Sequence, residues 1–204
     1  NAEFRDLQDA SGGTFGAFVA PIEPPGPSTR RTGLVITEIM YKPAPRQDGR
    51  VIDFIELYNS NPYWEDISGY RISADADYTF PPGTIMQGGS YLVIAANPGD
   101  IIDEYGISNV TGPYTNTLAT EGTIRLRNKE DAVLLEILYS NEPPWPVAAD
   151  GTGHSMVLAK PSYGENNPAA WATSDRVGGS PGRQDGYTAD ALRNVTINEF
   201  LANS

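Results

Sequence analysis

Residues 123–139, TIRLRNKEDAVLLEILY, hold two apolar segments separated by the charged stretch 128–131. Polar and apolar side chains alternate along residues 123–127, which is the two-residue period of a β-strand with one face toward a core. Residues 132–139 are apolar on both faces except at Glu136, which predicts a central strand covered on both sides. This stretch therefore indicates β-structure.

Working outward in both directions, the same patterns predict further short strands bounded by turn residues, at 34–41, 54–58, 70–72, 78–80, 91–95 and 155–158. One segment is expected to be helical: Asn97-Pro98 supplies a cap and a first-turn proline, and Gly106 ends the helix about two turns later. Many short strands joined by Gly and Pro turns are typical of an all-β fold, and we expect an antiparallel β-sandwich with one short helix.

The composition excludes several classes of function. The 204-residue chain has a net charge of −12, so its surface would repel nucleic acid and anionic lipid. Cysteine is absent, which excludes a thiol nucleophile, disulfides and cysteine-ligated zinc. No apolar run has the roughly 18–20 residues that a membrane span needs, and residues 1–10 lack the features of a signal peptide. The chain is expected to be a module whose leader is missing, from the extracellular space or the cell envelope.

The domain organisation follows from proline content and a short internal repeat. Residues 1–33 end in a Pro-rich stretch that predicts an extended linker, and residues 34–183 are expected to form the sandwich. The motif around Ile36, VITEIM, recurs as TINEFL around Ile197, a separation of 197 − 36 = 161 residues. We therefore interpret residues 184–204 as a linker plus the first strand of a following repeat.

A possible nucleophile lies in the stretch Gly153-His154-Ser155-Met156. A nucleophile elbow needs a second glycine two residues after the serine, and that position is Val157. His154 is the only histidine, and neighbouring strand side chains point to opposite faces, so it cannot act as a base for Ser155. We expect no catalytic residues and interpret this stretch as a glycine turn entering a strand.

The acidic side chains allow other possibilities. Asp75 and Asp77 alternate on what is expected to be a strand end, so that they would face the same side. With backbone carbonyls and a third carboxylate they form a candidate Ca²⁺ site, against the simpler interpretation of a solvated acidic loop. Glu38 and Glu56 lie within strands, where they could pair as carboxylates. We expect them instead to accept backbone or arginine hydrogen bonds at the rim of a sheet. No other cofactor is expected.

Three aromatic residues in predicted loops are the candidate binding residues, namely Tyr63, Trp64 and Tyr114. Exposed aromatic rings can stack on sugars or anchor a protein partner. They can also pack back on their own domain, as we expect of Trp145 and Trp171.

The ordered set of motifs LVITEIMYKP (34–43), DFIELYNSN (53–61), DISGYRISADADYTFPPGT (66–84), GGSYLVIA (88–95), ILYSNEPPWP (137–146), ADGTGHSMVL (149–158) and WATSDRVGGSPG (171–182) resembles bacterial members of the lamin-tail domain family. The resemblance implies an immunoglobulin-like β-sandwich without catalytic residues. It also implies an accessory unit of exported, multidomain proteins.

Together these patterns predict a non-catalytic interaction module of a larger exported bacterial protein. Its expected partners are neighbouring domains of the same parent chain, or a cell-surface protein or glycan. The alternative is a Ca²⁺- or carbohydrate-binding module that targets an enzyme domain elsewhere in the parent chain.

Overall fold

The computed structural model describes residues 32–186. Most of the predicted linker 1–33 and of the predicted next repeat 184–204 lies outside the described residues. The strands are β1 (Leu34–Met40), β2 (Phe54–Asn59), β3 (Glu65–Asp66), β4 (Arg71–Ala74), β5 (Tyr78–Thr79), β6 (Ile85–Met86), β7 (Tyr91–Ala95), β8 (Val110–Thr111), β9 (Gly122–Arg127), β10 (Val133–Tyr139), β11 (His154–Leu158) and β12 (Trp171–Val177).

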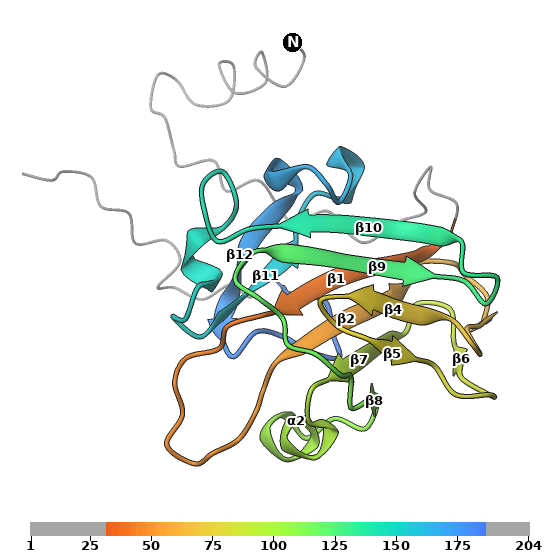
Figure 1. Ribbon diagram of the computed structural model, residues 1–204, viewed down its shortest axis with the longest axis horizontal. Coiled ribbons are helices and arrows are strands. Elements are labelled where there is room, and N and C mark those ends of the chain that lie inside the picture. The colour runs from red at the N-terminus through yellow and green to blue at the C-terminus, as the bar shows by residue number, and fades with distance from the viewer. Residues whose placement is uncertain (1–31, 187–204) are drawn as a thin grey trace, which may run out of the picture. The chain divides into compact units, whose positions relative to one another are not determined.

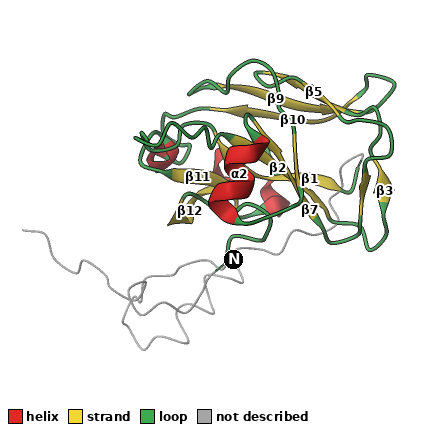
Figure 2. Cartoon of the chain, turned by 90° about the horizontal axis from the view of Figure 1, so that it is seen from below, coloured by secondary structure: helices red, strands yellow, loops and turns green. Residues whose placement is uncertain are grey.

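These strands form two stacked sheets and a short two-stranded ribbon (Figure 1). The larger sheet has the order β12-β11-β1-β2-β7-β8, the smaller has the order β10-β9-β4-β5, and β3 pairs with β6. Figure 2 shows β5, β9 and β10 in one layer and β1, β2, β7, β11 and β12 in the other. All pairs are antiparallel except the parallel pair β7–β8. The predicted immunoglobulin-like β-sandwich is confirmed.

The main core fills the space between the sheets. Alternate residues of the inner faces, such as Ile39, Ile55, Ile72, Ile124 and Ile137, are fully buried in it. Each such side chain contributes about 1.5–3 kcal/mol by leaving water. This apolar layer is what holds the two sheets together.

The outer face of the larger sheet carries a second, smaller core. Met40, Phe54 and Val93 project from the central strands of that face and pack with Ile101 of the helix α2 (Pro98–Tyr105). Because β1 is covered on both faces, all seven of its residues are buried. The helix begins after Asn97 and ends at Gly106, whose φ of 65° is left-handed, as the sequence predicted.

The expectation for residues 132–139 was wrong. Strand β10 lies at the edge of the smaller sheet, and Leu138 is 51% exposed. Its outward apolar residues mimic the pattern of a central strand. Strand β12 was not predicted, because its polar and apolar residues alternate poorly and only Trp171 and Ser174 are buried. The strands β3, β6 and β8 were not predicted either, and each has only two residues.

The remaining helices are single 3-10 turns, at Val147–Ala149, Pro161–Tyr163 and Pro168–Ala170. No helix within residues 32–186 has the length and apolar content to cross a membrane.

Candidate functional site

Two glutamate side chains are buried next to each other on the outer face of the larger sheet. Glu38 of β1 lies directly opposite Glu56 of β2 in the antiparallel register, and each is only 1% exposed. The register between the strands shifts at this point, between Ile36 and Glu38. Residues 178–182, which follow β12, supply hydrogen-bond donors to both acids, and we call them the strap.

The strap and the strand hydroxyls satisfy both carboxylates. The Ser180 N–H donates to Glu38 Oε1 at 2.9 Å, and the Gly182 N–H donates to Glu56 Oε2 at 2.6 Å. The Ser155 hydroxyl also donates to Glu38 Oε1, and the Thr37 hydroxyl donates to Glu56 Oε1 at 2.7 Å. The acids therefore act as acceptors that attach an irregular segment to the sheet.

Burial dominates the electrostatics of the pair. It raises the pKa of Glu38 to about 7, although the hydrogen bonds from Ser155 and Ser180 act in the opposite direction. Burial, followed by the charge of Glu38, raises the pKa of Glu56 well above its usual range. The buried Asp185 adds to the raised pKa of both glutamates.

The strap can approach this closely only because residue 179 is glycine. A Cβ atom at Gly179 would lie 2.1 Å from Glu38 Oε1 and 2.8 Å from Ser155 Oγ, and the residue has a φ of +75°. The Tyr105 hydroxyl of α2 donates to the Gly178 carbonyl at 2.6 Å and fixes the other side of the strap.

Ser155 does not lie on a nucleophile elbow. Ser155 is fully buried in the middle of β11, and its hydroxyl donates to Glu38. The ring of His154 lies 2.8 Å, measured from Nδ1, from the Ser174 carbonyl oxygen. The interpretation of residues 151–158 as a turn entering a strand agrees with the structure.

The expectation for the two glutamates was correct in one respect and wrong in another. They do accept backbone hydrogen bonds. They lie on adjacent central strands rather than at a rim, and no arginine contacts them in the hydrogen bonds and ion pairs of residues 32–186.

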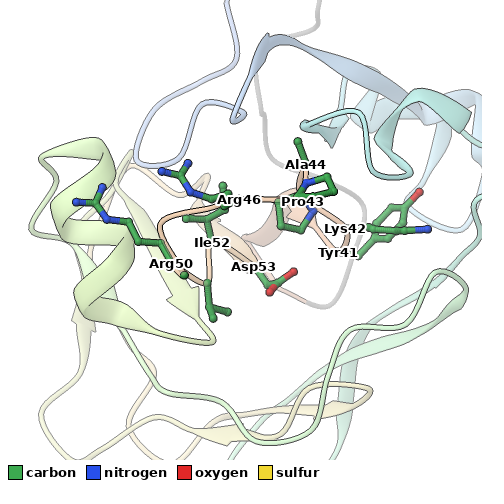
Figure 3. Close-up of a pocket in the computed structure, with 11 residues that line it drawn as sticks. Tyr41, Lys42, Pro43, Ala44, Arg46, Arg50, Ile52 and Asp53 are labelled. Atoms are coloured by element: carbon green, nitrogen blue, oxygen red, sulfur yellow. The ribbon is translucent and has the colours of Figure 1, made fainter.

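The long connection between β1 and β2 lines an open hollow (Figure 3). It has a volume of about 410 Å³, and Tyr41, Lys42, Arg46, Arg50 and Asp53 are among the residues that line it. Burial raises the pKa of Asp53 to about 6. Sequence reasoning did not identify this site, because its polar residues have no motif spacing.

Two of the predicted binding residues are exposed on a well-held loop. Tyr63 and Trp64 are 62% and 60% exposed. The buried Asn59 side chain donates to the carbonyls of Tyr63 and Met86 at 2.9 and 3.1 Å and so ties the loop to β6. The two rings are presented by a fixed backbone.

Tyr114 does not join them. Its side chain is only 5% exposed and belongs to the main core, so the expectation of an exposed aromatic was wrong. The residue follows β8, and its N–H donates to the Ala95 carbonyl at 3.2 Å, which turns the ring inward. The predicted core role of the tryptophans is correct: Trp171 is 6% exposed, and its ring centre lies 6.4 Å from that of Trp145.

The two candidate calcium ligands have separate partners. They lie in the β4–β5 turn, where strand alternation does not apply. Asp77 binds Arg71 with both carboxylate oxygens, whereas Asp75 Oδ2 accepts the Thr123 N–H at 3.0 Å. Within residues 32–186, no group of three or more His, Cys, Asp or Glu side chains is arranged to hold a metal ion.

The family comparison agrees with this architecture. A family model described as Lamin Tail Domain matches residues 27–141, which is more than half of the chain. A search of the curated proteins with this chain found no match. β1, β2, β4, β7, β9 and β10 lie inside the matched region, whereas β11, β12 and the strap follow it. By this match and its immunoglobulin-like sandwich, the chain belongs to the lamin tail domain family.

Proposed function

We propose that this chain is a non-catalytic interaction module of a larger exported bacterial protein, which spaces neighbouring domains or docks to a cell-surface partner. One observation carries the proposal: the candidate nucleophile and the paired acids are sealed inside. Ser155, Glu38 and Glu56 are 0%, 1% and 1% exposed, so no substrate can reach them. The family membership supports the same conclusion.

The loop of Tyr63 and Trp64 is the surface that best suits docking. Large aromatic side chains supply much contact area at low entropic cost. The loop backbone is held by Asn59 and lies so close to Gly88 that a Cβ there would be 2.6 Å from the Pro62 carbonyl carbon. A fixed backbone reduces the ordering cost of binding.

Composition supports the remaining parts of the proposal. The absence of cysteine and the content of 21 glycines and 17 prolines suit an exported bacterial protein. The net charge of −12 favours a neutral or basic partner over nucleic acid or an anionic membrane. We therefore place the module in the extracellular space or the cell envelope.

Two experiments test the proposal with the full chain. Esters, phosphoesters and glycosides should show no turnover, and turnover abolished by Ser155→Ala or Glu38→Gln would overturn the non-catalytic role. Retention on cells of the source bacterium, measured by fluorescence, should fall in the Tyr63→Ala/Trp64→Ala double variant. It should persist in Tyr163→Ala, which removes a ring that is 50% exposed elsewhere. Equal retention of all three proteins would exclude docking through this loop.

A second candidate function is carbohydrate binding. The observation in its favour is that two consecutive rings, each at least 60% exposed, lie on one fixed loop. Such rings can stack on sugars. A glycan array would separate the candidates: a specific glycan signal lost in the double variant identifies a carbohydrate module. Calcium gains no support, because Asp77 is occupied by Arg71.

A further inference from the structure

The hollow beside the β1–β2 connection combines apolar walls with polar groups. Pro43, Pro45 and Ile52 contribute apolar surface. Figure 3 shows Asp53 between Ile52 and Tyr41. The volume of about 410 Å³ is at the lower end of the range for small-ligand pockets. It suits one extended side chain better than a whole substrate.

The cations around the hollow are already paired. Arg46 binds both Asp48 and Glu104. Its Nη1 donates to Glu104 Oε1 at 3.0 Å, and its Nη2 donates to Glu104 Oε2 at 2.9 Å. Arg50 binds Glu104 at 2.7 Å. Figure 3 shows both guanidinium groups on the side of α2, away from the Asp53 carboxylate.

Lys42 is paired as well, with Asp150 at 2.6 Å. Three cations thus face four acids, a balance of 3 − 4 = −1, counting Lys42, Arg46, Arg50, Asp48, Asp53, Glu104 and Asp150. Asp100 accepts the Val51 N–H at 2.8 Å at the edge of the hollow and makes the region more negative. Within residues 32–186, Asp53 is the acid of this set whose carboxylate accepts a hydrogen bond only from its own backbone N–H.

Two buried hydroxyls near this acid also lack a partner. The hydroxyls of Tyr41 and Tyr114 have no hydrogen bond among residues 32–186, although their side chains are 4% and 5% exposed. Burial, and then the charge of Asp53, raises the pKa of Tyr114, which places that hydroxyl in the field of the carboxylate. Buried polar groups without partners are rare and commonly indicate a missing water or ligand.

We propose that this hollow binds a primary ammonium group, the end of a lysine side chain from a partner polypeptide, which pairs with Asp53. The lysine stem lies against the proline and isoleucine walls, and the ammonium group donates to the carboxylate. An ammonium with three donors can also serve a neighbouring hydroxyl oxygen. The lysine as source rests on the proposed interaction role, whereas the site for an ammonium group does not.

The binding has a defined pH dependence. Asp53 must be ionised to attract a cation, so affinity should fall as the pH drops through its pKa of about 6. The other facing acids, Asp48, Glu104 and Asp150, have lowered pKa values because of their cationic partners and stay charged in that range. The cations around the hollow are Lys42, Arg46 and Arg50. Tyr41, whose pKa burial raises to about 12, stays neutral in that range.

The test uses the full chain and amide NMR shifts of residues 41–53. The probes are Nα-acetyl-lysine amide, its Nε-acetylated form without the charge, and Nα-acetyl-arginine amide. We expect saturable shifts with the lysine probe, with a Kd on the order of millimolar for so small a ligand. Asp53→Asn should weaken binding at least about tenfold. The charge-matched control Glu130→Gln, in the β9–β10 turn at the opposite end of the sandwich (Figure 1), should bind normally.

Each other outcome contradicts the proposal. Equal shifts with the uncharged probe would show an apolar hollow only, and preference for the arginine probe would assign a guanidinium site. An Asp53 pKa below about 4, measured by NMR without a probe, would show that Lys42 or water already satisfies the acid. The enzyme and cell-retention experiments do not depend on these results, so the two proposals can fail separately.

Discussion

The sandwich should lose stability as the pH rises from about 5 to about 8, because Glu38 and Glu56 are buried side by side. A carboxyl group whose folded pKa lies above its unfolded pKa stabilises the fold fully below the unfolded pKa. That contribution disappears as the pH rises through the folded pKa. The pKa of Glu38 rises from 4.5 to about 7, so the loss of stability begins above the first value and continues as the pH rises through the second.

The magnitude follows from the same shift. A change of about 2.5 pKa units corresponds to about 3 kcal/mol of unfolding free energy lost by Glu38 alone. Glu56 is shifted in the same direction and adds to the loss. In the Glu38→Gln variant this contribution vanishes, and the pKa of Glu56 falls because its charged neighbour is gone.

Urea unfolding followed by tryptophan fluorescence measures the effect, since the buried Trp171 and the partly buried Trp145 pack together at the main core. The wild-type free energy should fall by about 3 kcal/mol more than that of Glu38→Gln across this pH range. Acids with lowered pKa, such as Asp77, act in the opposite direction only at lower pH. Glu130→Gln is the exposed control. Parallel pH curves for wild type and Glu38→Gln would refute the burial of this acid beneath the strap.

Four further substitutions test the contacts that hold the fold. Gly179→Ala should lower the free energy of unfolding, measured with urea, by about 2–4 kcal/mol, because the new Cβ would lie 2.1 Å from Glu38 Oε1 at a φ of +75°. An unchanged free energy would contradict the placement of the strap. Asn59→Ala should lower the free energy of unfolding by about 2–3 kcal/mol, since it removes hydrogen bonds of 2.9 and 3.1 Å to the carbonyls of Tyr63 and Met86. Amide hydrogen exchange should become faster in the loop that carries Tyr63. Ile137→Ala, at a fully buried site, should lower the free energy of unfolding by about 2–5 kcal/mol, whereas Leu138→Ala, at 51% exposure, should change it by less than about 1 kcal/mol. Equal losses in the two variants would contradict the outward position of Leu138 on the edge strand β10.

Much of the fold could be predicted because its signals are local. The alternation in residues 123–127 recurs as β9, and the cap and stop residues around Pro98–Tyr105 define the helix within one residue. What failed was the assignment of neighbours. Ile137 and Leu138 are both apolar, and nothing in one chain says that the second faces solvent.

The buried acid pair could be only half predicted, because its partners are distant in the sequence. Glu38 and Glu56 were recognisable as acids within strands, but Ser180, which donates to Glu38, lies 142 residues away. The prediction that Tyr114 is exposed failed for a similar reason, because a loop position predicts exposure only when no core lies beneath the loop. Tyr63 and Trp64 follow the rule, and Tyr114 does not.

The position of the two acids argues for a role in specifying the fold. Leucines in their place would bury more apolar surface, yet they would leave the N–H groups of Ser180 and Gly182 and the Thr37 hydroxyl facing the sheet without acceptors. Each such buried donor costs about 1–3 kcal/mol. The strap has no strand of its own to pair with, so side-chain carboxylates perform the task that a neighbouring strand performs elsewhere. The strap thus covers part of the outer face of the larger sheet, although it lies beyond residue 141, where the family match ends.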